Sequence, residues 1–251
     1  MTLAAPTTFA EAFSAVADVE GWMTRDQAQK LWDHASELTK GSQVVEIGSF
    51  RGRSAVILAS AAGPDVDVVA IDPHIGTDRG PQEIVTTAEL GQSDNDLFNA
   101  NLENAGVRDR VRHVRKLSSE ALDDVDGPIE LLYIDGAHRY GPARDDIVAW
   151  GDRVAPGGTL LIHDSFSSIG VTLALLSSVT FGPRWTYVGR AQSMAEYRKV
   201  GSTGSARLRN VGRQLAQLPW FFRNVVIKVL MVAHLGKLTR LLGHDAETWP
   251  Y

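Results

Sequence analysis

Short apolar runs alternate along this chain with segments of helical periodicity. The apolar runs have the length of buried strands, and they cover 43–47, 66–71, 110–114, 129–134 and 159–162. The segments between them are typical of helices, and they cover 51–62, 94–105, 143–150 and 169–179. Strands separated by helices indicate a doubly wound, mostly parallel α/β sheet. Two further runs, 185–188 and 194–198, predict an antiparallel C-terminal hairpin that brings the sheet to seven strands.

The segments on either side of this pattern are predicted to be helical. Thr24 and Gln27 have the spacing of a capping box that opens a helix. We therefore expect N-terminal helices over 1–40, a main domain over 41–200 and a helical tail over 205–251. The chain has no cysteine, and its first residues lack the basic and apolar regions of a signal peptide, so we expect a cytoplasmic protein.

Charge is unevenly distributed along the chain. The net charge is −5, but the tail after Gly204 carries about +5 and the rest about −10. An acidic body argues against general nucleic-acid binding. In the tail, Leu208, Val211, Leu215 and Leu218 share one helical face, which predicts helices that pack on the body or on a second subunit as a homodimer. Peripheral membrane contact is the alternative, while the charges argue against a membrane span.

The ends of the first two strands indicate a nucleoside site. Glu46 to Gly52 runs from a strand into a helix with a G-x-x-x-G turn, which lets the backbone approach a ligand. Asp72 ends the next strand, where an acid can accept hydrogen bonds from the two hydroxyls of a ribose. The glycine spacing differs from the G-x-G-x-x-G of dinucleotide binders, which disfavours a Rossmann oxidoreductase.

Four motifs follow one another along the chain: V-V-E-I-G-S-F-R-G-R-S, V-V-A-I-D-P-H, L-L-Y-I-D-G-A-H and V-A-P-G-G-T-L-L-I-H-D-S. In this order, they resemble the motifs of class I S-adenosylmethionine-dependent methyltransferases. The resemblance covers 43–198 and leaves the tail outside. Within that superfamily, the I-D-G-x-H-x-Y and P-G-G…H-D pieces are similar to a branch of metal-dependent sugar O-methyltransferases and cephalosporin-hydroxylase-like proteins.

This resemblance implies a set of cofactor-binding residues. Ser118 has an alternative role as a helix N-cap, because Glu120 follows in the first turn. The implied set is Glu46, Gly48, Ser49, Gly52, Ser54, Asp72, His74, Ser118 and Asp135.

The resemblance also implies a metal site and a catalytic base. Asp135, His163 and Asp164 fall where relatives hold magnesium, or manganese, although relatives usually have an acid in place of His163. The alternative is that His163 donates to a backbone carbonyl and Asp164 caps the next helix. His138 falls near the base of catechol-type relatives, and with Asp135 and His163 it completes the expected catalytic set. Alternatively, His138 bonds the helix start at 145–146.

Taken together, these residues predict an S-adenosylmethionine-dependent O-methyltransferase that modifies a hydroxyl of a sugar or short oligosaccharide. The Arg-rich, cysteine-free chain with extra C-terminal helices resembles mycobacterial enzymes of methylmannose polysaccharide synthesis, which implies a methylated mannoside acceptor. A catechol, phenol or other small metabolite is an alternative acceptor, and a membrane-associated scaffold that has kept the fold is a non-enzymatic alternative. Acceptor specificity is expected from the loop over 73–92. The aromatic residues at 220–222 either offer an apolar platform to a pyranose face or, as the favoured alternative, pack in the core.

Overall fold

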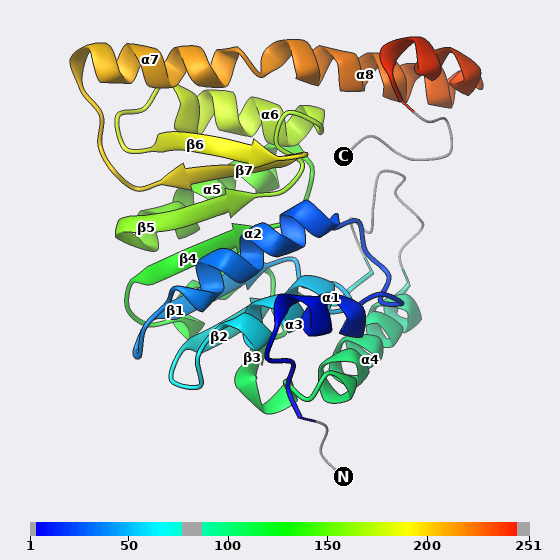
Figure 1. The fold of residues 1–251 in the computed structure, drawn as a ribbon, viewed down its shortest axis with the longest axis vertical. Coiled ribbons are helices and arrows are strands. Elements are labelled where there is room, and N and C mark those ends of the chain that lie inside the picture. The colour runs from blue at the N-terminus through cyan, green and yellow to red at the C-terminus, as the bar shows by residue number, and fades with distance from the viewer. Residues whose placement is uncertain (1–3, 77–86, 245–251) are drawn as a thin grey trace.

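The computed structural model describes residues 4–76 and 87–244. Seven strands form one sheet (Figure 1). The strands are β1 (Gln43–Ile47), β2 (Asp67–Ile71), β3 (Val111–Val114), β4 (Ile129–Ile134), β5 (Val154–Ile162), β6 (Thr186–Ala191) and β7 (Met194–Arg198). The α-helices are α1 (Phe9–Ala15), α2 (Arg25–Ser36), α3 (Arg53–Ala61), α4 (Ala88–Asn104), α5 (Tyr140–Arg153), α6 (Ile169–Leu175), α7 (Gly204–Leu215) and α8 (Leu218–Val232). Shorter helical turns are η1 (Arg108–Arg110), η2 (Ser118–Glu120), η3 (Leu122–Asp124), η4 (Leu176–Thr180) and η5 (Gly236–Leu242).

The sheet order is β3-β2-β1-β4-β5-β7-β6, with the first five strands parallel and the last two antiparallel to their neighbours. The chain therefore starts at the middle of the sheet, winds outward to β3, and returns to continue from β4 on the other side of β1. This reversal makes the carboxyl ends of β1 and β4 the switch point, where open α/β sheets bind their ligands. The predicted fold class is confirmed.

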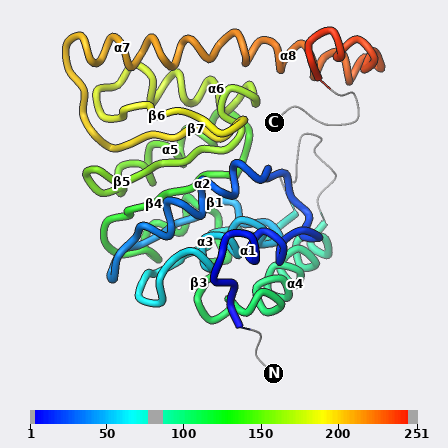
Figure 2. The backbone as a smooth tube through the Cα atoms, viewed as in Figure 1, coloured from blue at the N-terminus to red at the C-terminus, as the bar shows by residue number. Residues whose placement is uncertain are grey.

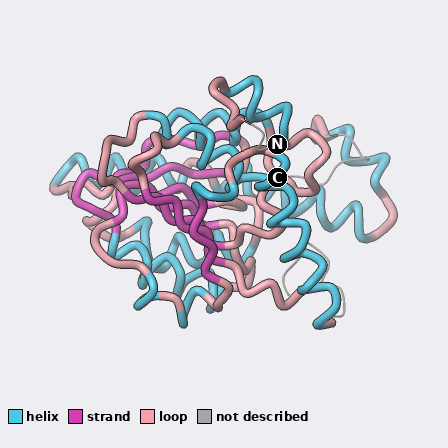
Figure 3. The backbone as a smooth tube through the Cα atoms, turned by 90° about the horizontal axis from the view of Figure 1, so that it is seen from below, coloured by secondary structure: helices cyan, strands magenta, loops and turns pink. Residues whose placement is uncertain are grey.

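Each face of the sheet is covered by its own group of helices (Figure 3). Alternate residues of a strand point to opposite faces, so Val44 and Leu131 join the core under α1 to α4, whereas Val45 and Leu132 join the core under α5 and α6. Both sides of the central strands are consequently buried, which explains why their sequences are continuously apolar.

Two expected boundaries differ from the structure. The helix expected from Asp94 begins at Ala88, because the Thr87 side chain accepts a hydrogen bond from the Leu90 amide and caps it. The turn expected over 155–158 lies within β5, where the pairing with β4 shifts register between Ile129 and Leu131 and the four residues bulge outward. Of the loop expected over 73–92, residues 77–86 lie outside the described part of the chain.

The tail forms α7 and α8, which run end to end along the β6 edge of the molecule (Figure 2). Pro219 stands in the first turn of α8 and separates the two helices, as expected. The predicted packing face is wrong in part: Val211, Leu215 and Leu218 are half-buried, but Leu208 is 75% exposed, and the polar residues Asn210 and Gln214 are buried. By length and composition alone, the stretch Gly204–Val232 could cross a membrane.

A buried ion cluster joins helix α2 to strand β7, near the β6 edge of the sheet. Glu196 on β7 accepts hydrogen bonds from Lys30 and pairs with His34 at 3.1 Å, both from α2. Burial by itself would raise the pKa of Glu196, but the hydrogen bonds from His34 and Lys30 outweigh it and lower the pKa to about 2. The folded state therefore favours the ionised carboxylate.

We predict that Glu196→Gln lowers the free energy of unfolding by about 2 kcal/mol at neutral pH, less than the full pKa shift implies because Lys30 is partly exposed. In the wild-type protein, this contribution is present above the ordinary glutamate pKa and is lost as the pH falls toward the folded pKa of about 2. Urea unfolding between pH 3 and pH 7 measures both effects. Asp65→Asn, which breaks the exposed Lys40–Asp65 pair, is the control and should be nearly neutral. Equal stability of wild type and Glu196→Gln at every pH would contradict the prediction.

Candidate active site

An open cavity of about 480 Å³ lies where β1, β2 and β4 end. Its walls come from the turns after these strands, from the start of α5, and from the segment 20–23 before α2. Of the predicted site residues, those that line the cavity are Gly48, Ser49, Ser54, Asp72, His74, Ser118, Asp135 and His138. Glu46, Gly52, His163 and Asp164 lie behind this surface or beside it. The volume is that of a pocket for a small molecule.

Gly48 allows two of these turns to touch. Its φ is +86°, and a Cβ atom there would lie 2.3 Å from the carbonyl oxygen of Asp135. Any side chain at this position would therefore collide with backbone. Gly48 therefore lets the turn after β1 approach the end of β4, and this contact brings Asp135 to the cavity wall.

Glu46 is a buried acid without an ordinary hydrogen bond. It is 1% exposed, and no partner of ordinary geometry among the described residues reaches either carboxylate oxygen. Burial raises its pKa to about 7, with the hydroxyls of Ser54 and Ser49 opposing this rise and the charges of Asp135 and Asp72 adding to it. A positively charged group entering the adjacent cavity would stabilise the ionised form.

Asp72 is held rigidly at the end of β2. Its two carboxylate oxygens accept hydrogen bonds from the Phe50 and His74 amides, each at 2.8 Å. A carboxylate has about four acceptor positions, so oxygen lone pairs remain for hydroxyl groups in the cavity. The backbone turn after β1 and the acid after β2 are thereby fixed to each other.

His74 and Ser118 are engaged with protein groups. The His74 ring is 3% exposed, bonds the Phe50 carbonyl oxygen at 2.7 Å and packs on His113 and Phe98, so it supports the turn beside Asp72. The Ser118 hydroxyl donates to the Asp146 carboxylate, and no side-chain cap is formed at η2. The N-cap alternative for Ser118 is therefore wrong.

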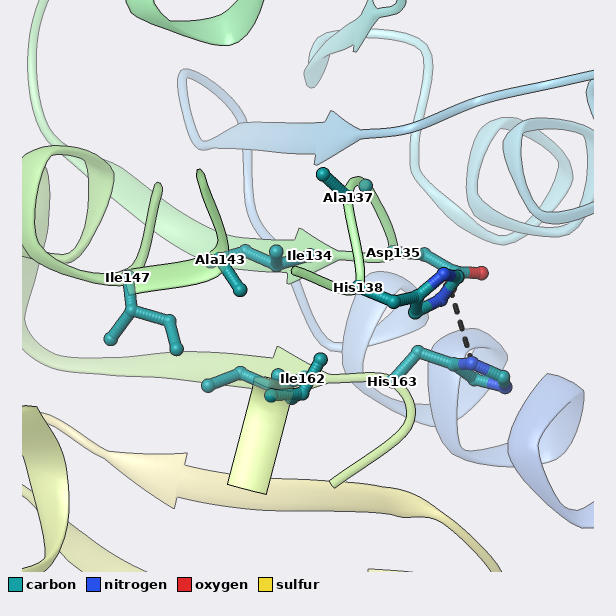
Figure 4. A pocket seen from close by; sticks show the side chains of 10 residues that line it. Ile134, Asp135, Ala137, His138, Ala143, Ile147, Ile162 and His163 are labelled. Atoms are coloured by element: carbon teal, nitrogen blue, oxygen red, sulfur yellow. Dashed lines mark ion pairs between the residues drawn. The ribbon is translucent and has the colours of Figure 1, made fainter. Parts of the chain in front are cut away.

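Asp135, His138, His163 and Asp164 form one chain of ion pairs. Figure 4 shows the Asp135–His163 pair, with His138 beside it. Asp135 accepts a hydrogen bond from the Tyr133 hydroxyl at 2.9 Å and lies 3.1 Å from Nδ1 of His163. Nε2 of His138 lies 2.9 Å from Oδ2 of Asp164. The backbone carbonyl of Asp164 accepts hydrogen bonds from the Ser167 and Ser168 amides in the turn before α6. The N-cap of α6 is Ser168, so the cap alternative for Asp164 is wrong. His138 also contacts Asp164 and not the helix start at 145–146.

The two histidines of this chain each lie beside a carboxylate that favours the protonated ring. Burial alone would lower the pKa of His163, but the negative charges of Asp135 and Asp164 raise it to about 9. The same competition applies to His138, where burial is outweighed by the hydrogen bond and charge of Asp164, and the pKa rises above 6.5. Each imidazolium therefore has a carboxylate to balance it.

This arrangement does not match the metal site that the sequence predicted. Among the residues described here, no group of three histidine, aspartate or glutamate side chains is arranged to hold a metal ion. The carboxylates of Asp135 and Asp164 face the His163 imidazole at 3.1 and 3.7 Å. The three predicted ligands lie together, but as an ion-pair cluster.

Two parts of the cavity wall were not predicted from the sequence. Trp22 stacks on Phe50 with ring centroids 5.7 Å apart, and both line the cavity. Asp146 lines it beside Ser118, and burial raises its pKa to about 6. Asp146 lies inside a helix, and Trp22 is distant in sequence from every strand end, so neither carried a local signal.

The aromatic residues expected to contact an acceptor lie elsewhere. Trp220 and Phe221 pack partly buried against the core under α5 and α6, with the Arg190 guanidinium 3.9 Å from the Trp220 ring centroid. Phe222 is 60% exposed on the outer side of α8. None of the three lines the described cavity.

Part of the chain is similar in sequence to known methyltransferases. Residues 45–165 match a family model described as a methyltransferase domain. Catechol O-methyltransferase of Mycobacterium tuberculosis is 29% identical over 133 residues, which are 53% of this chain and 51% of that protein. An uncharacterised protein of Sinorhizobium fredii is 38% identical over 55 residues, 22% of this chain and 6% of that protein. The chain thus spans about half or less of these curated relatives.

Solved O-methyltransferases share the fold. The O-methyltransferase TomG of Streptomyces achromogenes, solved in complex with S-adenosylmethionine, aligns over 77% of this chain and 89% of its own, with 17% identity and a TM-score of 0.54. An O-methyltransferase of Bacillus cereus in complex with S-adenosylhomocysteine aligns over 78% and 90%, with 16% identity and a TM-score of 0.52. Residues 45–165 thus match a methyltransferase domain, and the chain has the fold of these solved O-methyltransferases.

Proposed function

We propose that this chain is a class I S-adenosylmethionine-dependent O-methyltransferase. The observation that carries the proposal is the group of three acids, Glu46, Asp72 and Asp135, around the end of neighbouring strands at one cavity of about 480 Å³. Acids at these positions complement a ligand that carries positive charge and ribose hydroxyls.

The residues present fit this cofactor. Glu46 is a buried acid that lacks a partner among the described residues, and it would balance the cationic methionine end beside Ser49 and Ser54. The remaining lone pairs of Asp72 suit the two ribose hydroxyls. Ser118 and Asp146 lie together on the same cavity wall, where a carboxylate would accept a hydrogen bond from an adenine amino group.

We predict that Asp72→Ala weakens S-adenosylhomocysteine binding at least about tenfold, because hydrogen bonds to a charged acceptor are lost. Isothermal titration calorimetry measures the change. Asp67→Ala, at the opposite end of β2 and away from the cavity, is the matched control and should bind like wild type. Absence of binding by the wild-type protein would overturn the proposed function, and equal binding by Asp72→Ala would overturn the role of Asp72.

His138 is the proposed base. Bound S-adenosylmethionine supplies an electrophilic methyl group, so the protein must orient an acceptor hydroxyl and take its proton. Nε2 of His138 is engaged by Asp164, which leaves Nδ1 for the acceptor. Asp164 stabilises the imidazolium that forms, as the acid does in a catalytic triad. Asp135 and His163 complete the network and fix the orientation of these groups.

The pH dependence of methyl transfer tests this assignment. Neutral His138 is the active form, so kcat/KM should fall as the pH decreases through the His138 pKa, which lies above 6.5. Asp164→Asn removes the charge that raises this pKa, and should move the acidic limb to lower pH by about one unit or more. Asp152→Asn, at an exposed pair with Arg184, should leave the limb unchanged. An identical limb in Asp164→Asn would exclude His138 as the base.

Divalent-metal assistance at Asp135, His163 and Asp164 is the alternative route to the same product. The ion-pair chain favours proton transfer by His138. We therefore predict that methyl transfer stays within about twofold of its initial rate after treatment with EDTA and passage over a chelating resin. Loss of turnover that magnesium or manganese restores would establish the metal route.

A sugar hydroxyl is the proposed acceptor. The stacked Trp22 and Phe50 rings offer an apolar surface to a pyranose face, beside acids that accept hydrogen bonds from its hydroxyl groups. Short methylated mannosides are the first candidates. Catechols and phenols are the second class, because the Mycobacterium tuberculosis relative is a catechol O-methyltransferase.

An acceptor screen with labelled cofactor separates the two classes. We expect transfer to short mannosides or glucosides, and a rise in the acceptor KM of about tenfold in Trp22→Ala, because a large stacking surface is lost. Val148→Ala, on the outer side of α5, is the control. Transfer to phenols alone would contradict the sugar proposal and leave the cofactor site unaffected.

A further inference from the structure

Helices α7 and α8 bury several polar residues against the protein and expose a band of apolar residues to solvent. Asn210, Gln214 and Asn224 are fully or almost fully buried, whereas Phe222 and Val232 are more than half exposed. Surface helices of globular proteins show the opposite pattern. This pattern raises two questions: which groups of the protein bind the buried polar residues, and which partner covers the exposed apolar residues.

The cause on the inner side is the free edge of β6. Asn210 accepts a hydrogen bond from the Tyr187 amide and donates one to the Trp185 carbonyl, both at 2.8 Å. Arg213 donates to the carbonyls of Tyr187 and Val188 at 3.0 and 2.7 Å. These side chains satisfy backbone groups that an edge strand leaves unpaired. Because Asn210 and Gln214 occupy the inner side of α7, Leu208, Gly212 and Ala216 face outward, and Val211 and Leu215 are half-buried.

Helix α8 is held in the same orientation. Its Lys228 donates to the Ser167 carbonyl oxygen at 3.1 Å, and the Asn224 amide reaches the Phe166 carbonyl oxygen at 3.5 Å. Only Ile227 joins Asn224 among its fully buried residues. Rolling either helix to hide its apolar side would therefore break several buried hydrogen bonds.

The exposed apolar residues form a continuous band, which we call the outer stripe. Its members are spaced three or four residues apart and contain no charged side chain. All are exposed, and the band continues from α7 through α8: Leu208, Gly212, Ala216, Pro219, Phe222, Val226, Val229 and Val232. Leu235, Leu238 and Leu241 extend it into η5, with Leu241 84% exposed. Apolar surface of this extent marks an interaction site.

The charges around the outer stripe indicate which partner binds it. Residues 204–244 contain seven arginines and lysines and no aspartate or glutamate. Among them, Arg209, Lys237 and Arg240 are exposed beside the outer stripe. An apolar band flanked by positive charge complements an anionic lipid surface. Two copies packed stripe to stripe would instead bring two basic segments together with no acid to pair them.

The geometry favours helices that lie flat on the bilayer. The stretch Gly204–Val232 is long enough to span a membrane, but it includes Arg213 and Lys228, whose hydrogen bonds hold it to the protein. Spanning by the most apolar part, 215–232, would require the Lys228 hydrogen bond to break and both Arg223 and Lys228 to enter lipid. We propose that the outer stripe docks on an anionic membrane surface, with α7 and α8 parallel to the membrane plane.

Vesicle flotation of the full-length protein tests this proposal. We expect binding to phosphatidylcholine vesicles that contain phosphatidylglycerol, and binding at least about tenfold weaker to phosphatidylcholine alone. The double variant Phe222→Asp, Val229→Asp should lose at least about tenfold in vesicle binding. Val200→Asp, at an equally exposed apolar residue outside the tail, is the matched control and should bind like wild type. Thermal melting verifies that each variant is folded.

Three results would overturn the proposal. One is failure of the wild-type protein to bind the anionic vesicles, and another is undiminished binding by the folded double variant. The third is a stable dimer in light scattering that the double variant dissociates, without vesicle binding, which would assign the outer stripe to a second copy. Resistance of the membrane-bound protein to alkaline carbonate extraction would show a spanning helix and contradict the flat orientation.

Discussion

The contact between the turns after β1 and β4 organises the site. Gly48 lies against the Asp135 carbonyl so closely that only a residue without a side chain fits. Parallel pairing of β1 with both β2 and β4 then brings Asp72 and Asp135 to the same edge. Without this contact, the acids would end neighbouring strands but would not share a cavity.

Acidic side chains gathered at one edge of the sheet repel one another, and the protein stabilises their ionised forms to different extents. Asp72 is stabilised by two backbone amides, and Asp164 by His138, which helps to hold the pKa of Asp164 well below its usual range. Glu46 has only the Ser54 and Ser49 hydroxyls beside it, and burial raises its pKa to about 7. Glu46 lies beside the cavity, so a cationic ligand there would stabilise its ionised form.

The sequence predicted the strands closely because continuous apolar runs are a local signal. β1 and β4 have the predicted limits, and the acid that ends β2 stands at the cavity. The face of α7 was predicted wrongly, since periodicity records which residues share a face but not whether β6 needs hydrogen bonds from Asn210. The arrangement of His163 with Asp135 was also beyond prediction, because an imidazole and a carboxylate can pair with each other as readily as they can share a metal.

The most direct test of this account is a crystal structure of the full-length protein with S-adenosylhomocysteine. The account predicts the ribose hydroxyls at Asp72, the amino-acid end toward Glu46 and Ser49, and the adenine beside Ser118 and Asp146. It also predicts that the thioether sulfur lies on the same side of the cavity as His138 and Asp135. Electron density for the ligand outside this cavity, or a ribose bound away from Asp72, would contradict it.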